Sequence, residues 1–246
     1  MDLLAQIAPF ALVCARTTAF LFAAPPFSHG GIPTSVKAMM GVLLGVCLAP
    51  GRTAPAGTGA FIVGMVTEVA LGAGLGLLIA TVLAAVQTAG HMIDQLGGFQ
   101  LAEAYDPLTS SQNGPFGRFY LLIATVLLFA SDGYQMLLIG FARSFTAIPP
   151  GAVLDVKSLA DVLTRELPDL MVAALQIAGP LIAVLFLADL GLGLLTRVAP
   201  SLNAFAMGFP LKILLTLALG SLAVVTLPQA VSGLTSHAVD LMLGQR

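Results

Sequence analysis

Residues 174–212, ALQIAGPLIAVLFLADLGLGLLTRVAPSLNAFAMGFPLK, decide the fold that this chain adopts. Two long apolar runs flank a short turn sequence that begins at Pro200 and ends at Asn203. Proline ends helices and sets turns, and long apolar runs are typical of helices in a lipid or protein interior. The stretch therefore predicts a C-terminal helical hairpin with Pro200 and Asn203 in its turn.

Asp189 and Lys212 place one acidic and one basic residue inside these apolar runs. A charge there costs about 2.5 to 3.5 kcal/mol on insertion scales, so each side chain needs a partner, an aqueous cavity or a buried protein face. Because the midpoint of the two positions falls at the Pro200–Ser201 junction, a reversal there sets both roughly 17 Å from the turn. We hypothesise an Asp189–Lys212 ion pair across the hairpin. The alternative is that each residue faces a different neighbour.

The composition of the whole chain indicates a membrane protein. Of its 246 residues, 58% are hydrophobic and 9% are charged, and the mean hydropathy is +0.99. Soluble domains carry about 25% charged residues. The length accommodates about six spans of roughly 20 residues each. The net charge of −2 and the scattered Lys and Arg residues provide no basic surface for nucleic acid. We expect a single-domain, all-α integral membrane protein that binds no nucleic acid.

Six apolar runs predict about six hydrophobic helical segments. They are Leu3–Ala24, Val36–Leu48, Phe61–Ala89, Phe119–Phe141, Leu170–Thr196 and Ala204–Leu227. The second run is short for a membrane crossing, which favours packing against protein. Two small-xxx-small pairs, Gly41 with Gly45 and Gly72 with Gly76, predict close helix packing. Residues 153–169 mix charges with apolar residues at helical spacing and predict an amphipathic helix that lies at an interface or over a partner.

Four charged residues in or near the apolar runs are candidate buried polar residues: Arg16, Glu68, Asp94 and Asp132. In a transporter, intramembrane acidic residues serve as ion or proton relays. For Asp132, a turn or helix break is the favoured interpretation over a relay. His91 and Asp94 lie three residues apart, but two ligands do not form a metal site without a third. We expect no metal or other cofactor and, because common enzyme motifs are missing, no catalysis.

Residues 97–118, GGFQLAEAYDPLTSSQNGPFGR, form a polar segment between two apolar runs. A segment of this length without a helix pattern of its own is usually functional or disordered. It nevertheless carries the bulky apolar side chains of Phe99, Tyr105, Leu108 and Phe116. Two interpretations stay open: the segment fills a pore or cavity reversibly, or it is an ordinary surface loop.

Two ordered series of residues carry a resemblance to a known family. The series in the C-terminal hairpin is Pro180, Asp189–Leu192, Pro200, Asn203, Phe205 and Gly208–Lys212. The earlier series is Arg16, Ala24-Pro25, Ile32-Pro33, Lys37, Glu68, Gly90, Asp94, Gly97, Asp106-Pro107, Asp132–Tyr134, Ser144-Phe145, Pro149 and Gly151. Together they resemble the FliR/SctT family of type III secretion export-gate proteins. The chain departs from the commonest pattern at Asp132, where the family has Asn before Gly.

The resemblance implies a non-enzymatic pore subunit that assembles with FliP-like and FliQ-like chains, beside an FlhB-like subunit. Unfolded export substrates would pass through this assembly in the bacterial inner membrane, at the flagellar basal body. It also implies a FliP-like part over residues 1–165 and a FliQ-like hairpin part over residues 166–246. In the family, the loop after the Asp-Pro pair contributes a plug that closes the channel. The corresponding residues here are Asp106, Pro107, Leu108, Asn113, Pro115, Phe116 and Arg118, with Phe116 the leading apolar candidate.

Two other hypotheses stay open. A proton-coupled secondary solute transporter would use Glu68, Asp132 and Asp189 as its ion sites. An injectisome homologue would differ only in the substrates that it exports. The Lys and Arg residues fall in successive connections without the sided excess that orients most membrane proteins, which favours a chain placed by partner subunits.

Overall fold

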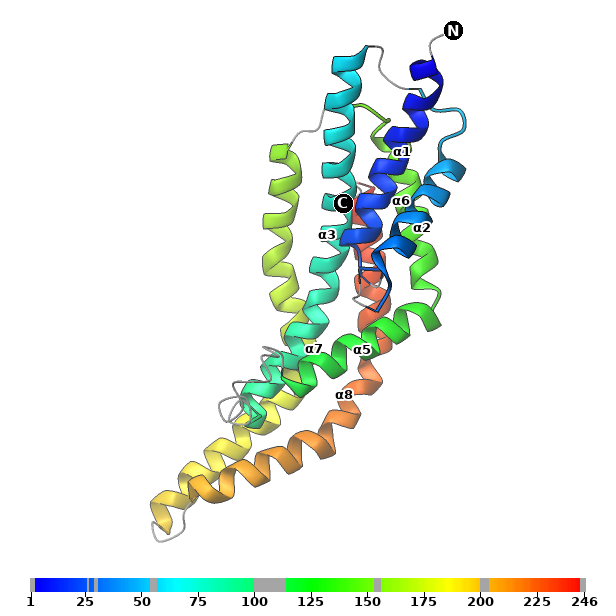
Figure 1. The fold of residues 1–246 in the computed structure, drawn as a ribbon. Helices are drawn as coiled ribbons and strands as arrows, with labels where there is room; N and C mark the ends of the chain where they lie inside the picture. The colour runs from blue at the N-terminus through cyan, green and yellow to red at the C-terminus, as the bar shows by residue number, and fades with distance from the viewer. Residues whose placement is uncertain are drawn as a thin grey trace. The chain divides into compact units, whose positions relative to one another are not determined.

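The computed structural model describes residues 3–25, 27–28, 31–53, 57–99, 114–152, 156–199 and 204–243. Across these ranges all the regular secondary structure is helical (Figure 1). The helices are α1 (Leu3–Ala23), α2 (Thr34–Leu48), α3 (Thr58–Gly97), α5 (Pro115–Ala130), α6 (Gly133–Ala147), α7 (Val156–Val198) and α8 (Ala204–Met242). The prediction of an all-α protein is confirmed.

Several helices are long and apolar enough to cross a membrane. α3 and residues Ala160–Val198 of α7 qualify by themselves. Two bent pairs, Pro115–Ala130 with Gly133–Ala147 and Met207–Gly220 with Val224–Met242, add two further spans if each pair counts as one. By length and composition, the described ranges therefore hold two to four spans, as an integral membrane helical protein requires.

The fourth predicted run is split into α5 and α6 by a turn at Ser131 and Asp132. Asp132 adopts a left-handed conformation with φ of 56°, which Asp tolerates better than most residues do. Its backbone oxygen accepts hydrogen bonds from the amides of Gln135 and Met136. Its side chain is exposed, so its prediction as a buried polar residue is wrong. The tight turn leaves the carboxylate outside the packed helices, 3.1 Å from Gln135 Nε2, and the interpretation as a turn is the correct one.

The predicted amphipathic stretch, residues 153–169, is not a separate helix. From Val156 onward it is continuous with the next apolar run in α7, through Pro168 and Pro180. Each proline removes one helical hydrogen bond and favours a kink. No glycine or turn cluster separates the two stretches, so the helical pattern runs on to Val198.

The chain divides into two compact units. The first unit comprises residues 1–82, 131–167 and 234–246, and the second comprises residues 83–130 and 168–233. α3, α7 and α8 each contribute residues to both units. Glu68 belongs to the first unit, whereas Asp94 and Asp189 belong to the second.

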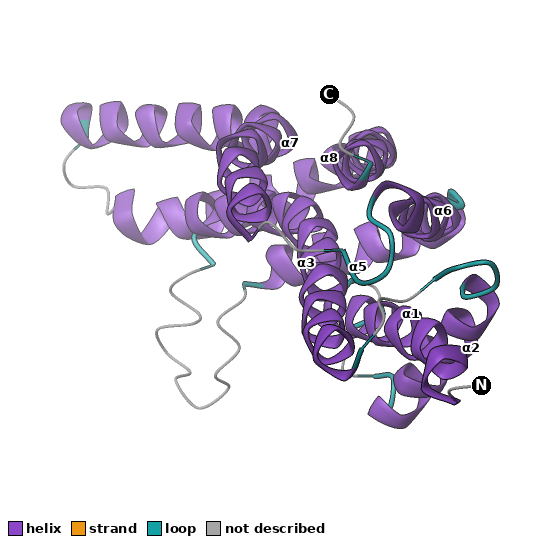
Figure 2. Ribbon diagram, turned by 90° about the horizontal axis from the view of Figure 1, so that it is seen from above, coloured by secondary structure: helices purple, strands orange, loops and turns teal. Residues whose placement is uncertain are grey.

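In the first unit, α1 lies between α2 and α3 (Figure 2). A Cβ atom at Gly45 on α2 would lie 2.6 Å from Cys14 Sγ. A Cβ atom at Gly76 on α3 would lie 2.6 Å from the Cβ atom of Ala23. These distances are too short for any side chain, so both helix backbones approach α1 closely, as the small-xxx-small pairs predict.

Aromatic rings attach α6 to α1. Phe20 of α1 stacks on Phe141 of α6 with ring centroids 4.0 Å apart. Phe141 makes an edge contact with Phe145, at 5.3 Å between centroids. All three side chains are buried, and such aromatic pairs contribute about 0.5 to 1.5 kcal/mol beyond the burial of their area. This packing sets Phe145 beside Arg16.

Candidate functional site

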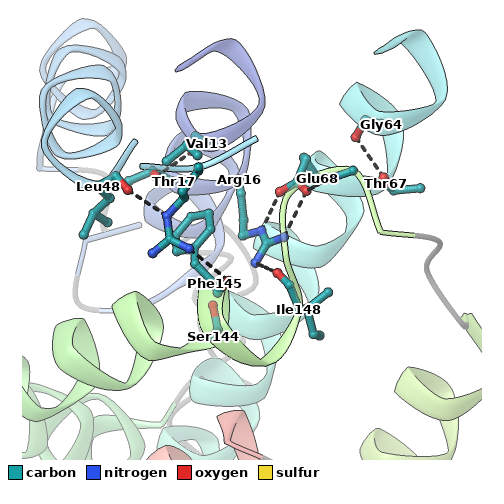
Figure 3. A network of polar contacts seen from close by, with 12 residues as sticks. Val13, Arg16, Thr17, Leu48, Gly64, Thr67, Glu68, Ser144, Phe145 and Ile148 are labelled. Carbon is teal, nitrogen blue, oxygen red and sulfur yellow. Dashed lines mark hydrogen bonds and ion pairs between the residues drawn. The ribbon is translucent and has the colours of Figure 1, made fainter. Parts of the chain in front are cut away.

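Arg16 and Glu68 form a fully buried ion pair in the first unit (Figure 3). Arg16 on α1 donates from Nε to Glu68 Oε2 at 2.5 Å and from Nη2 to Oε1 at 2.9 Å. Two parallel bonds of this kind use the planar fork of the guanidinium, which matches a carboxylate. Because an unpaired charge in the interior is strongly destabilising, each residue makes the burial of the other possible.

The same pair holds the connection that follows α6. Arg16 Nη1 donates to the backbone oxygen of Ile148 at 3.0 Å. The backbone amide of Gly151 donates to Glu68 Oε1 at 2.9 Å. Gly151 has φ of 80°, a left-handed conformation that glycine adopts without strain. Arg16 and Glu68 thus hold α1, α3 and the connection after α6 together, so the pair anchors this connection to the two helices.

Arg52, in the connection between α2 and α3, adds a second guanidinium that lies against the same Phe145 ring as Arg16. Its Nε donates to Leu48 O at 2.8 Å and its Nη1 donates to Phe145 O at 2.9 Å, at helix ends where cations are favourable. The Phe145 ring centroid lies 4.3 Å from Arg16 Cζ and 4.8 Å from Arg52 Cζ. Burial, and then the charge of Arg16, lower the pKa of Arg52. Arg52 is not among the predicted site residues, and a basic residue directly after a Pro-Gly turn is its only sequence signal.

Asp94, in the second unit, is 3% exposed and binds the first turn of α5 with its carboxylate. The amide of Phe116 donates to Oδ1 at 3.0 Å and the amide of Gly117 donates to Oδ2 at 2.9 Å. The first amides of a helix have no partner within that helix. Asp94 therefore caps α5 from another helix, α3.

Glycines bring α3 and α5 into backbone contact. A Cβ atom at Gly90 would lie 2.6 Å from Phe116 O, and one at Gly117 would lie 2.6 Å from His91 Cε1. His91 Nε2 also lies 3.4 Å from Gln87 Nε2 on the same helix. The residues that the structure describes contain no group of three His, Cys, Asp or Glu side chains that could hold a metal ion.

Asp189 on α7 and Lys212 on α8 lie in contact in the second unit. Lys212 Nζ is 2.6 Å from Asp189 Oδ1. The Lys212 side chain is 18% exposed and that of Asp189 is 40% exposed, so the pair lies near the surface of this unit. The structure brings the two charges together as hypothesised. The turn residues Pro200 and Asn203 lie outside the described residues.

The plug candidates fall into two groups. Asp106, Pro107, Leu108 and Asn113 lie outside the described residues. Pro115, Phe116 and Arg118 form the first turn of α5. Their prediction as loop residues is wrong, because proline suits the first position of a helix and Asp94 caps the turn.

Phe116, the leading apolar plug candidate, is packed inside the second unit at 9% exposure. Its ring centroid lies 5.4 Å from that of Phe99 and 6.4 Å from that of Tyr120. A Cβ atom at Gly220 on α8 would lie 3.0 Å from Phe116 Cε1. An open apolar cavity of about 520 Å³ adjoins it between α5 and α8; its lining includes Phe119, Leu217 and Val224.

A further pair, the buried Glu166 with the half-exposed His237, is not among the predicted site residues. Glu166 Oε2 lies 2.7 Å from His237 Nε2, and the Glu166 side chain is 5% exposed. Glu166 sits in the mixed-charge stretch that predicts an amphipathic helix, and the sequence pattern alone gives no sign that this residue is buried. The pair joins α7 to the end of α8 within the first unit.

The model of one protein family, bacterial export proteins, family 1, matches residues 7–238. The flagellar biosynthetic protein FliR of Bacillus subtilis is 30% identical over 83% of this chain and 81% of its own length. The protein of the same name from Pectobacterium carotovorum is 28% identical over 98% of this chain and 94% of its own length.

Two relatives with other names match over a shorter range. The secretion system apparatus protein SsaT of Salmonella typhimurium is 31% identical over 63% of this chain and 60% of its own length. The Yop proteins translocation protein T of Yersinia pestis is 28% identical over 59% of this chain and 56% of its own length. Since the family model spans nearly the whole chain, this protein belongs to the bacterial export proteins, the FliR/SctT family of non-enzymatic type III export membrane proteins.

Proposed function

We propose that this chain is a pore subunit of the flagellar type III protein export gate in the bacterial inner membrane. It assembles there with FliP-like and FliQ-like subunits, beside an FlhB-like subunit, at the flagellar basal body. Unfolded flagellar proteins pass through the assembly. The observation that carries the proposal is the family match over residues 7–238.

Exposed apolar surface on α2 supports assembly with other subunits. Val36, Met39, Leu43 and Val46 are between 42% and 72% exposed and line one apolar groove. α2 has 15 residues, whereas a helix needs about 20 to cross a bilayer. Large exposed apolar patches mark interaction sites with protein or membrane. Sister subunits would cover this helix, which is too short to be a free span.

The acidic residues argue against the alternative, a proton-coupled secondary solute transporter. Glu68 is bound by Arg16 and by the Gly151 amide, and Asp189 is bound by Lys212. Asp132 is exposed on a turn. A relay needs carboxylates that are free to take up and release a proton along a path. The ion pairs occupy two of the three acids that such a carrier would use.

We assign residues 1–165 to the FliP-like part and residues 166–246 to the FliQ-like hairpin part of the chain. The hairpin part contains α7 from Glu166 onward and all of α8, with only residues 199–203 between the two helices. The Asp189–Lys212 contact across these helices supports a hairpin.

We assign the sealing of the closed channel to the segment that ends at α5. Phe116, the leading apolar candidate, packs against Phe99 and Tyr120 at the end of this segment, and Leu108 is the apolar candidate among residues 106–113. Deleting residues 106–113 leaves the first turn of α5 in place and should raise ion leakage through the assembled complex. Unchanged leakage in an assembled complex would contradict this role.

A gene deletion tests the function itself. Loss of the chain should stop secretion of flagellar export substrates and abolish motility, and the gene supplied in trans should restore both. Continued flagellar secretion, with loss of injectisome secretion, would assign the chain to an injectisome. We favour a flagellar function over an injectisome function because the flagellar relatives from Bacillus and Pectobacterium match 83% and 98% of this chain, whereas SsaT matches 63% of it.

A further inference from the structure

Arg52 joins the ends of two helices that lie far apart in the sequence. Its Nε donates a hydrogen bond to the backbone oxygen of Leu48, the last residue of α2, at 2.8 Å. Its Nη1 donates to the backbone oxygen of Phe145, in the last turn of α6, at 2.9 Å. The same guanidinium lies over the Phe145 ring, with Cζ 4.8 Å from the ring centroid. One half-buried side chain therefore binds α2 and α6 together.

The usual α-helical donor is missing at both of these carbonyl oxygens. In an α-helix the amide of residue i+4 binds the oxygen of residue i. For Phe145 that residue is Pro149, which has no amide hydrogen. For Leu48 it is Arg52 itself, whose amide donates instead to Ala49 O at 3.1 Å. The Arg52 side chain thus supplies the donors that the ends of both helices need.

Two further contacts hold the rest of α2. At its start, Lys37 is 7% exposed and donates from Nζ to Ser28 O at 2.8 Å. In its middle, a Cβ atom at Gly41 would lie 2.5 Å from Thr18 Oγ1 on α1, so the two helix backbones are in close contact. The helix is therefore held at its start, along α1 and, through Arg52, at its end.

The exposed side of α2 is the apolar groove described above. Met39, Leu43 and Val46 follow helical spacing along it, and the side chains that line it are all Val, Ala, Met or Leu. The 15 residues of α2 span about 22 Å at 1.5 Å per residue, short of the roughly 30 Å of a bilayer core. An apolar helix of a neighbouring subunit therefore suits this groove better than lipid does.

We propose that Arg52 is a positioning residue for assembly. By fixing the end of α2 to the end of α6, it presents the α2 groove in the one orientation that an apolar helix of a neighbouring gate subunit binds. A surface that is in the competent orientation only part of the time binds with an apparent affinity lowered by that fraction. Arg52 therefore acts on the affinity for the neighbouring subunit. This inference rests on the proposed function of the chain.

The experiment measures assembly per molecule of chain. The tagged full chain is expressed with its FliP-like and FliQ-like subunits, and the amount of each subunit recovered with it is divided by the amount of chain. Arg52→Met removes both hydrogen bonds and keeps an apolar stem. Arg52→Lys keeps the charge and loses the planar fork. Arg143→Met, which removes an exposed arginine from α6, is the matched control.

Recovery of the partner subunits should fall severalfold in Arg52→Met, fall less in Arg52→Lys and stay unchanged in Arg143→Met. Overproduction of the partner subunits should restore recovery with Arg52→Met, because a higher partner concentration compensates for a lower affinity. A photo-reactive amino acid in place of Leu43 identifies what covers the groove. It should crosslink to a FliP-like or FliQ-like subunit, and Arg52→Met should lower the yield severalfold.

Three results would overturn the inference. The first is unchanged recovery with Arg52→Met or, if that chain does not accumulate, with Arg52→Lys. The second is recovery that stays low when the partner subunits are overproduced, because this indicates a misfolded chain. The third is crosslinking from position 43 to lipid alone or to a second copy of this chain.

Co-purification with the unmodified chain separates failure of this inference from failure of the proposed function. A complex with FliP-like and FliQ-like subunits that does not depend on Arg52 would remove the positioning role and leave the proposed function intact. No such complex around the unmodified chain would remove both.

Discussion

Arg16 and Glu68, which are 52 residues apart in sequence, form a two-bond ion pair with no exposed surface on either side chain. The pair also binds Ile148 O and the Gly151 amide, so three segments of the first unit meet at these two residues. Moving a charged group from water into the protein interior costs about several kcal/mol per ion, and the idealised Born cost is of order 20 kcal/mol. The attraction between the two ions offsets this desolvation cost. Such a pair contributes to specifying which segments meet as well as to stability.

Removing one partner of this pair should be far worse than removing both. Arg16→Met leaves the Glu68 carboxylate buried with only the Gly151 amide bound to it. A buried charge left in this way costs about 3 to 5 kcal/mol. Arg16→Met with Glu68→Leu leaves no unpaired charge and should recover much of that loss. Thermal unfolding of the purified complex measures the loss of stability in each single variant and in the double variant. A loss in the double variant equal to the sum of the two single losses would contradict coupling between the residues.

The Asp189–Lys212 pair should survive reversal of its charges. Asp189→Leu leaves Lys212 unpaired in an apolar helix and should cost about 2.5 kcal/mol, the lower end of the cost of one embedded charge. Asp189→Lys with Lys212→Asp restores the attraction across the hairpin. The amount of assembled complex per cell, measured by pull-down, should fall in the Asp189→Leu variant. It should return to the unmodified amount in the charge-reversed variant. No recovery on reversal would show that each residue serves a different neighbour.

Glycine at position 72 should be indispensable to the contact between α1 and α3. A Cβ atom there would collide with the backbone oxygen of Arg16, which cannot move as a side-chain tip can. Gly72→Ala should therefore destabilise the fold by about 1 to 3 kcal/mol, the usual cost of overpacking. Gly59→Ala, on the same helix with no atom within 4 Å of its Cβ position, is the control. It should be neutral or stabilising by up to about 1 kcal/mol, because alanine favours helices. Equal effects of the two substitutions would rule out the close contact as the cause.

Tyr120 should tolerate loss of its hydroxyl. The hydroxyl oxygen is buried and has no hydrogen-bond partner among the described parts of the chain. A buried polar group without a partner costs about 1 to 3 kcal/mol. Tyr120→Phe keeps the ring contact with Phe116 and should raise the melting temperature or leave it unchanged. A lower melting temperature would reveal a partner for the hydroxyl.

The hairpin pair was predictable because all the needed information is local. Asp189 and Lys212 are the embedded charges of the two runs, and both lie at the same distance along the chain from the Pro200–Ser201 junction. Helix rise then sets them at one depth. The turn at Asp132 was predictable for a similar reason, since a glycine follows it.

The other polar contacts depend on how distant segments pack, which no local pattern records. Arg16 and Glu68 can be selected singly as charges in apolar runs, but their pairing follows from glycines that bring α1 and α3 together. The cap of α5 has no local signal, because its N-cap residue is glycine and the carboxylate comes from α3. Glu166 lies in a charged stretch of sequence, and its burial depends on packing against α8, where His237 lies 2.7 Å from it.

Co-purification tests the central claim most directly. The chain carrying an affinity tag is expressed from its own locus, extracted in mild detergent and sized, and the associated proteins are identified. The account predicts a single large complex that contains FliP-like and FliQ-like subunits, with little free chain. A stable monomer or homodimer that takes up a solute in exchange for protons would contradict it.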